Sequence, residues 1–302
     1  QHMTVGEFYL ALIDEFERNG KLGNRRAYKG SYNSLNSFTG DNLDICFEDI
    51  TQGWLLNYES WLRAKGNKET TISIQFRTLR SVYNKAIKRK CVGKEYYPFE
   101  DFHINKFNVH TDKRAISKND VLKIISADLT GKSEYVKFSR DIFVFSYLCG
   151  GINFCDVASL TKENILNGRL FYVRQKTGKQ INLCLTKNAS AIIDKYYKGG
   201  KGFLFPILDV TRHITATQRE NRLHKVLGQV DKSLKIVAQI AKVDVNLTTY
   251  VARHSYATVL KRSGVPTSII CESLGHSSER VTQIYLDSFE NEQIDEAMKN
   301  LL

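Results

Sequence analysis

The apolar residues of the first hundred positions recur at intervals of three and four, which is the spacing of helices and not of strands. Four segments have this pattern, and the first three end at Asn19-Gly20, Gly40 and Gly66, which favour helix ends. The segments are 5–18, 25–38, 49–65 and 70–90. Four amphipathic helices with short connections predict a compact helical bundle.

The pattern weakens from about Tyr96 to Arg114, where Pro98 and several polar residues interrupt it. A stretch of this kind is typical of a connection between domains. We therefore expect a first domain at 4–106, a linker at 107–114 and a second domain at 115–302.

The second domain is expected to be helical with a small sheet inserted. Helical spacing recurs at 117–129, 133–148, 154–160, 187–197, 220–241, 249–263, 267–274 and, as a terminal pair, within 278–302. Between these helices, short β-like runs at 164–166, 169–174 and 180–185 are separated by Asn167-Gly168 and Thr177-Gly178. Asn-Gly between such runs indicates a hairpin. The predicted class is mostly α: a helical bundle followed by a mixed α+β domain with a small antiparallel sheet.

The net charge indicates the kind of partner. The chain has 44 Lys and Arg against 32 Asp and Glu, a formal charge of +12. A chain this basic commonly binds a polyanion, and nucleic acid is the first candidate; a generic solvated surface is the alternative. No apolar run is long enough to cross a bilayer, so we expect no membrane association and a cytoplasmic, nucleoid-associated protein. Six cysteines without Cys-x-x-Cys spacing predict neither a metal site nor a disulfide framework, and we expect no cofactor.

The fourth helical segment has a cationic stripe beside its apolar one. Lys, Arg and hydroxyl side chains on one helix suit contacts with DNA phosphates, although a solvated helix surface has the same composition. The residues expected to contact DNA are Lys68, Thr70, Thr71, Arg77, Arg80, Lys85 and Lys88.

Candidate chemistry lies in the second domain, in three boxes and at one hairpin tip. Arg253-His254 occurs near the start of a predicted helix, and Leu274-Gly275-His276 forms a turn between two others. Tyr285 follows His276 by nine residues, and Lys176 lies at the tip of the predicted hairpin.

These boxes, in this order and spacing, resemble those of the tyrosine recombinase (phage integrase) family, and particularly integrases of mobile elements in Bacteroides-type bacteria. The resemblance covers most of the chain and implies a SAM-like core-binding domain followed by a catalytic domain. It implies that Tyr285 is the nucleophile, that Arg253 and His276 hold the scissile phosphate, and that Lys176 is the general acid. Lys179, across the same turn, is a rival for that role.

The expected reaction explains these residue types. A tyrosine hydroxyl attacks a DNA phosphate and forms a 3′-phosphotyrosyl bond, which a second strand can later reverse without ATP. The transition state carries extra negative charge that fixed donors must meet. An Arg fork binds two phosphate oxygens at once, so no metal is needed.

The chain departs from the family pattern at two positions. Asn153 stands where the first catalytic Arg is usual, and Tyr250 stands where a His is common, keeping a hydroxyl donor there. Arg174 lies two residues before Lys176, so on a strand both side chains would project from one face. We expect Arg174 to replace the missing Arg; the alternative is that it contacts a neighbouring DNA phosphate.

The expected function is therefore site-specific DNA recombination, with a catalytically weakened DNA-binding protein or a type IB topoisomerase as alternatives. The expected partners are double-stranded DNA attachment or core sites, three further copies of the chain in a homotetramer on DNA, and accessory DNA-bending factors. A final helix at about 290–302 would dock on a neighbouring copy or fold back on its own domain. Related integrases often carry an additional N-terminal arm-binding domain, which we expect this chain to lack.

Overall fold

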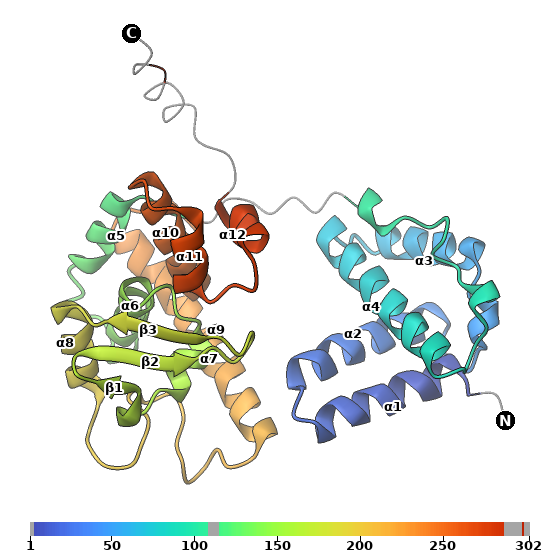
Figure 1. Cartoon of the computed structure of the whole chain (residues 1–302), viewed down its shortest axis with the longest axis horizontal. Helices are drawn as coiled ribbons and strands as arrows, with labels where there is room; N and C mark the ends of the chain where they lie inside the picture. Colours follow the sequence, from blue (N-terminus) through green and yellow to red (C-terminus); the bar gives the residue numbers. More distant parts are fainter. Residues whose placement is uncertain (1–2, 108–114, 287–297, 299–302) are drawn as a thin grey trace. The chain divides into compact units, whose positions relative to one another are not determined.

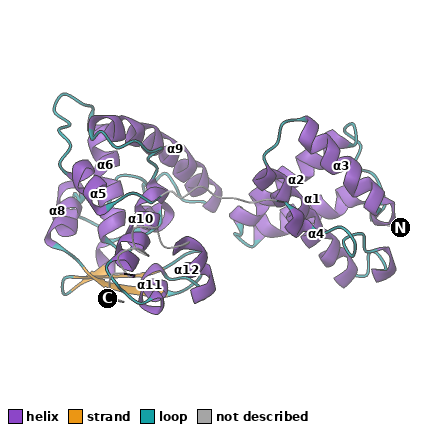
Figure 2. Ribbon diagram, turned by 90° about the horizontal axis from the view of Figure 1, so that it is seen from above, coloured by secondary structure: helices purple, strands orange, loops and turns teal. Residues whose placement is uncertain are grey.

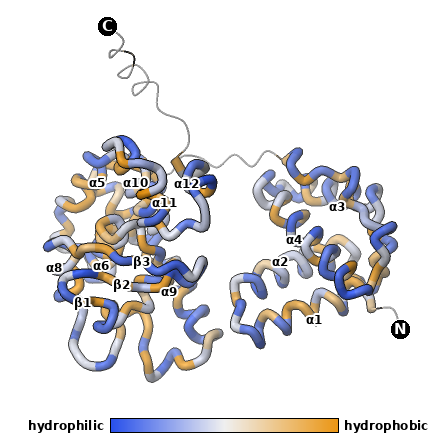
Figure 3. Tube along the Cα trace, in the orientation of Figure 1, coloured by the Kyte–Doolittle hydropathy of each residue, from blue (hydrophilic) through white to orange (hydrophobic). Residues whose placement is uncertain are grey.

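The computed structural model describes residues 3–107, 115–286 and 298. The chain divides into two compact units, residues 1–112 and 113–302 (Figure 1). No helix within the described ranges is long and apolar enough to span a membrane. In both units hydrophobic and hydrophilic residues alternate along the helices, as amphipathic packing requires (Figure 3).

The first unit contains the four predicted helices. They are α1 (Val5–Arg18), α2 (Leu22–Phe38), α3 (Gln52–Ala64) and α4 (Glu69–Lys88). Helix α1 begins at a capping box, in which Thr4 and Glu7 each accept a hydrogen bond from the other's backbone N–H. The core is rich in aromatic residues, and buried tyrosines keep their hydroxyls bonded, as in the 2.9 Å contact of Tyr9 with Ser31.

The segment before residue 108 belongs to the first unit and is not a free linker as far as it is described. Phe99, Phe102, Ile104 and Phe107 are buried in the first core. The expectation that the connection starts near Tyr96 is therefore wrong. Two short 3-10 helices, Lys94–Tyr96 and Ile104–Lys106, give this segment an irregular apolar spacing that matches no single helical or strand period.

The second unit is built around α6 (Glu134–Leu148). Both faces of this helix are buried, because α9 (Ala216–Ile240) and α10 (Thr249–Arg262) pack against it. The remaining described helices are α5 (Lys118–Ile125), α7 (Phe154–Ser159), α8 (Lys187–Tyr196), α11 (Thr267–Leu274) and α12 (Glu279–Leu286).

The predicted sheet is present in the second unit, with antiparallel strand order β1-β2-β3. Its strands are β1 (Ile165–Leu166), β2 (Arg169–Val173) and β3 (Gln180–Cys184). Asn167 and Gly168 both have positive φ, as a two-residue hairpin turn between β1 and β2 requires. The sheet buries Leu170, Tyr172 and Ile181, and α11 packs against β3 (Figures 1 and 2).

Most helix boundaries lie within three residues of the prediction, and two differ by four. Helix α9 begins four residues before the expected Glu220, because Thr215 and Gln218 form a capping box ahead of the apolar stripe. Helix α5 ends at Ile125, before the expected Leu129. The helix expected at about 290–302 lies outside the described residues, apart from Met298.

Candidate active site

The turn between α11 and α12 brings backbone carbonyls and a histidine to one place. Helix α11 ends at Leu274, and Gly275 follows with φ +62°. A Cβ at Gly275 would lie 2.9 Å from Ile181 Cδ1 and 3.1 Å from Arg174 Cδ. Glycine is therefore required both by the left-handed backbone and by the close approach of the sheet and its hairpin.

Arg253 lies at the centre of this site, only 1% exposed. Its Nη1 donates to the Gly151 carbonyl at 2.8 Å and its Nη2 donates to the Leu274 carbonyl. A Cβ at Gly151 would lie 2.8 Å from Arg253 Cα, so glycine lets the α6–α7 turn approach α10. These bonds hold the guanidinium fixed and satisfy part of its donor capacity in a buried position.

Arg174 reaches the same site from the end of β2. It follows Val173, the last residue of the strand, and it is buried like Leu170 and Tyr172, so the strand alternation still holds at this position. Its backbone N–H donates to the Lys179 carbonyl at 2.8 Å, and the turn that contains Lys176 begins only after it. Arg174 is 5% exposed, whereas Lys176 is exposed, so the expectation that both project from one strand face is wrong. Arg174 Nη1 donates to the Gly275 carbonyl at 2.7 Å, and Thr177 Oγ1 donates to the same oxygen at 2.9 Å.

The two buried arginines give the site a positive charge. They bind the carbonyls of consecutive residues, Leu274 and Gly275, which places both guanidinium groups beside His276. Arg174 Nε is buried and makes no hydrogen bond within the described part of the chain. A buried donor on a cationic group without a partner is costly, and an anion would relieve it.

Asp156 is the buried carboxylate that faces these arginines. It is 3% exposed, and its Oδ1 accepts from the backbone N–H of Gln175 at 3.1 Å. Burial raises the pKa of Asp156, against the opposing effects of that hydrogen bond, Arg174 and Arg253. Asp156 Oδ2 makes no hydrogen bond among the described residues, and one carboxylate carries too little charge to neutralise two guanidinium groups.

His276 is buried at 3% exposure, and its Nδ1 lies 2.9 Å from Thr282 Oγ1 on α12. Burial lowers the pKa of His276 from 6.5 to about 4, and Arg253, Arg174, Lys176 and Lys179 add to the shift. Its ring is consequently neutral at neutral pH. Thr282 and Thr177 were not predicted from the sequence, where nothing distinguishes them from surface threonines.

The lowered pKa of His276 predicts a specific pH dependence of stability. Between pH 6.5 and about 4 the unfolded chain binds a proton at this residue and the folded chain does not. The free energy of unfolding should therefore fall as pH falls through this window, by at most about 1.4 kcal/mol per pH unit from this residue. His276→Gln should remove that part of the slope, as measured by denaturant unfolding of both proteins across the window. Equal slopes in both proteins would mean that folding does not shift this pKa.

The other predicted catalytic residues are placed as follows. Asn153 is the half-buried N-cap of α7, one helical turn before Asp156. Tyr250 is 41% exposed on α10, with its ring 4.9 Å from that of His254. Lys176 and Lys179 are both exposed on the β2–β3 turn, and both lower the pKa of His276. The structure therefore does not decide which of them is the general acid. Tyr285 is on α12, one turn after Thr282; its side chain lies outside the described residues.

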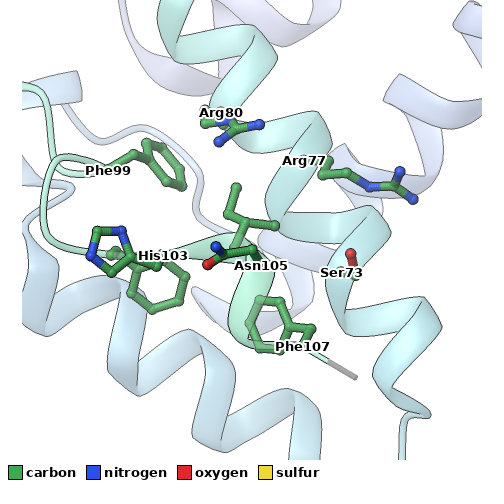
Figure 4. Close-up of a pocket in the computed structure, with 9 residues that line it drawn as sticks. Ser73, Arg77, Arg80, Phe99, His103, Asn105 and Phe107 are labelled. Atoms are coloured by element: carbon green, nitrogen blue, oxygen red, sulfur yellow. The ribbon is translucent and has the colours of Figure 1, made fainter. Parts of the chain in front are cut away.

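The predicted DNA-contacting residues lie on or beside α4 in the first unit. Arg77, Arg80 and Lys88 are exposed, whereas Thr70, Thr71 and Lys85 are half-buried. Lys68 is the exposed N-cap residue and precedes the helix. Arg77 and Arg80 project from successive turns of α4 at the edge of a pocket that is lined on its other side by the 99–107 segment (Figure 4).

Comparison with known protein families divides the chain near the boundary between the two structural units. Residues 4–108 match the phage integrase SAM-like domain, and residues 114–292 match the phage integrase family. Tyrosine recombinase XerD of Halalkalibacterium halodurans is 24% identical over 239 residues, covering 78% of this chain and 77% of that protein. Tyrosine recombinase XerC of Pediococcus pentosaceus is 26% identical over 260 residues, covering 82% and 80%.

Two solved structures show a similar fold. The Tn1549 transposon integrase in complex with a circular intermediate DNA superposes with a TM-score of 0.67 at 17% identity, covering 99% of both chains. A lambda integrase dimer bound to a COC′ core site also gives 0.67, at 15% identity, covering 95% of this chain and 79% of that one.

The fold and the matched domains define a DNA-recombining enzyme of the tyrosine recombinase class. The chain belongs to the phage integrase family, whose model spans more than half of its length. It is accordingly a site-specific DNA recombinase.

Proposed function

We propose that this recombinase cuts DNA with Tyr285 and holds the scissile phosphate between Arg253, Arg174 and His276. The observation that carries the proposal is the pair of buried guanidinium groups on the consecutive carbonyls of Leu274 and Gly275. Two buried guanidinium groups side by side favour an anion, and their planar forks suit phosphate oxygens.

The residues divide the reaction between them. The Tyr285 hydroxyl attacks phosphorus and loses its proton to water, forming a 3′-phosphotyrosyl bond while the bond to the 5′-oxygen breaks. Arg253 and Arg174 meet the negative charge of the transition state, and His276 donates a hydrogen bond to the same group. Lys176 supplies the proton that the leaving 5′-oxygen takes up; Lys179 is the alternative donor.

Arg174 takes the place of the Arg that Asn153 lacks. The strand alternation that first suggested this role does not extend to Lys176, but the burial and the contacts of Arg174 support the role independently. Arg174 Nε has no hydrogen bond within the described chain, and Arg174 lies beside Asp156, one helical turn from Asn153. Tyr250 is exposed on α10, the helix that carries Arg253, and its hydroxyl can donate to the DNA backbone.

The experiment that tests the function is capture of a covalent adduct. The substrate carries the attachment site and a nick a few nucleotides to the 3′ side of the cleavage position. After cleavage the short fragment with the free 5′-hydroxyl dissociates, so rejoining is prevented and the phosphotyrosyl intermediate is trapped. We expect an adduct that survives denaturation and proteolysis to a DNA-linked peptide containing Tyr285. DNA binding without any adduct would favour the catalytically weakened protein that Asn153 and Tyr250 suggest.

We further propose that the substrates are the core or attachment sites of a mobile element of the Bacteroides type, recombined by a tetramer with accessory DNA-bending factors. Support comes from solved relatives of similar fold, among them a lambda integrase tetramer bound to a Holliday junction, with a TM-score of 0.61 and 15% identity. No observation favours a type IB topoisomerase.

The first unit is proposed to be the core-binding domain, which binds DNA phosphates through the cationic residues of α4. Arg77→Ala and Arg80→Ala should each weaken binding to all DNA sequences and reduce the slope of log K against log salt by about 0.9. Lys94→Ala removes an equal charge from an exposed position outside α4 and serves as the control. If all three variants show the parent slope, the stripe is a solvated surface.

A further inference from the structure

One hydrogen bond links the histidine of the site to the helix that carries the nucleophile. His276 Nδ1 lies 2.9 Å from Thr282 Oγ1, and both side chains are buried, Thr282 at 0% exposure. Because Nδ1 is engaged in this way, a hydrogen bond from His276 to a phosphate would use Nε2. The neighbours of the ring are cationic, with Arg253, Arg174, Lys176 and Lys179 all raising the potential around it.

The position of the ring proton decides whether His276 can act. Its lowered pKa keeps the ring neutral at neutral pH, so it carries one proton that resides on either Nδ1 or Nε2. With the proton on Nδ1, Nε2 would present a lone pair and repel a phosphate oxygen. A hydroxyl that donates to Nδ1 places the proton on Nε2 instead.

We propose that Thr282 is a positioning residue of the cleavage reaction, whose hydroxyl donates to His276 Nδ1 and so holds the ring proton on Nε2, facing the phosphate. The assignment of His276 to the phosphate rests on the function proposed above, whereas the tautomer does not. Thr282 precedes Tyr285 by one turn of α12. The same helix therefore carries the nucleophile and the residue that fixes the proton on His276 Nε2.

The way α12 is held extends this inference. Leu286 is 5% exposed in a small separate cluster with Ala257, Ile270 and Leu274, and Lys261 Nζ donates to the Leu286 carbonyl at 3.0 Å. This cluster docks α12 on its own catalytic unit. The hydrogen-bond donor on Nε2 is therefore in place only while the helix of the nucleophile is docked.

The first test reads the tautomer directly, from ¹⁵N chemical shifts of the His276 ring in the free protein above pH 6.5, assigned with His276→Gln. We expect protonated Nε2 in the parent and in Thr282→Ser, and a mixture of tautomers in Thr282→Val. Protonated Nδ1 in the parent, or an unchanged ring in Thr282→Val, would overturn the proposal. This readout needs no DNA cleavage, so it holds even if the proposed function fails.

The second test separates positioning from packing. Thr282→Val should slow adduct formation on the nicked substrate about 10- to 100-fold with unchanged DNA affinity, and Thr282→Ser should restore it. In a His276→Gln background Thr282→Val should cost nothing further, because the group that it positions is gone. An equal loss in both backgrounds would make Thr282 a packing residue. Thr282→Ala replaces Thr282→Val if thermal unfolding shows that the valine variant does not fold.

Discussion

Tyr285→Phe should abolish the covalent protein–DNA adduct while DNA affinity and thermal stability stay at the parent level. The substitution removes only the hydroxyl that forms the bond to phosphorus, and no other group then supplies the nucleophile. Adduct formation on the nicked substrate should fall by at least ~10³-fold, as expected when a covalent nucleophile is lost. Denaturing gel electrophoresis of the reaction measures the adduct, and a parallel titration measures binding.

Tyr197→Phe is the matched control, because it removes a hydroxyl whose hydrogen bond goes to the Gly200 carbonyl, in the same unit. We expect parental cleavage from this variant. An adduct that persists in Tyr285→Phe would place the nucleophile at another residue, and peptide mapping of that adduct would identify it.

The second large effect concerns the arginine that stands in for Asn153. Arg174→Ala should reduce the cleavage rate by about 10² or more with nearly unchanged DNA affinity, because a clamp on the transition state acts on chemistry rather than on binding. Arg174→Lys keeps the charge and loses the fork, so we expect a rate between those of the parent and Arg174→Ala. Single-turnover cleavage at saturating protein separates the two effects.

Asn153→Arg supplies the complementary change. In the Arg174→Ala background it should recover part of the lost rate, since it places a cation at the N-terminus of α7, near Asp156. In the parent it should change little or be harmful, because a third cation would crowd Arg174 and Arg253. Arg174 would be a simple backbone contact if Arg174→Ala lowered binding and cleavage equally. A strong rate increase from Asn153→Arg alone would show that the clamp position was empty.

The local pattern of the sequence was sufficient for most of the fold. Four helices of the first unit, the Asn167-Gly168 hairpin and the helices that carry Arg253 and Tyr285 follow from periods of 3.6 and 2, which each segment contains by itself. Where prediction failed, local signals were weak or overlooked. The start of α9 depends on the capping pair of Thr215 and Gln218, and the aromatic residues of 99–107 follow no regular period.

The sequence by itself determined which residues are available for the chemistry, because the Arg253, His276 and Tyr285 boxes occur in a family-specific order. Only the tertiary structure decided how they meet. Arg174 lies at the end of β2 and its role depends on the Gly275 carbonyl, 101 positions away, whereas Thr282 acquires a role only through the ring of His276. Such contacts join residues from separate elements, and their geometry depends on the packing of the hairpin, α10 and α11 around two glycines that permit close approach. Periodicity describes which face of an element is buried, but it contains no information on which buried polar groups will come within hydrogen-bond distance.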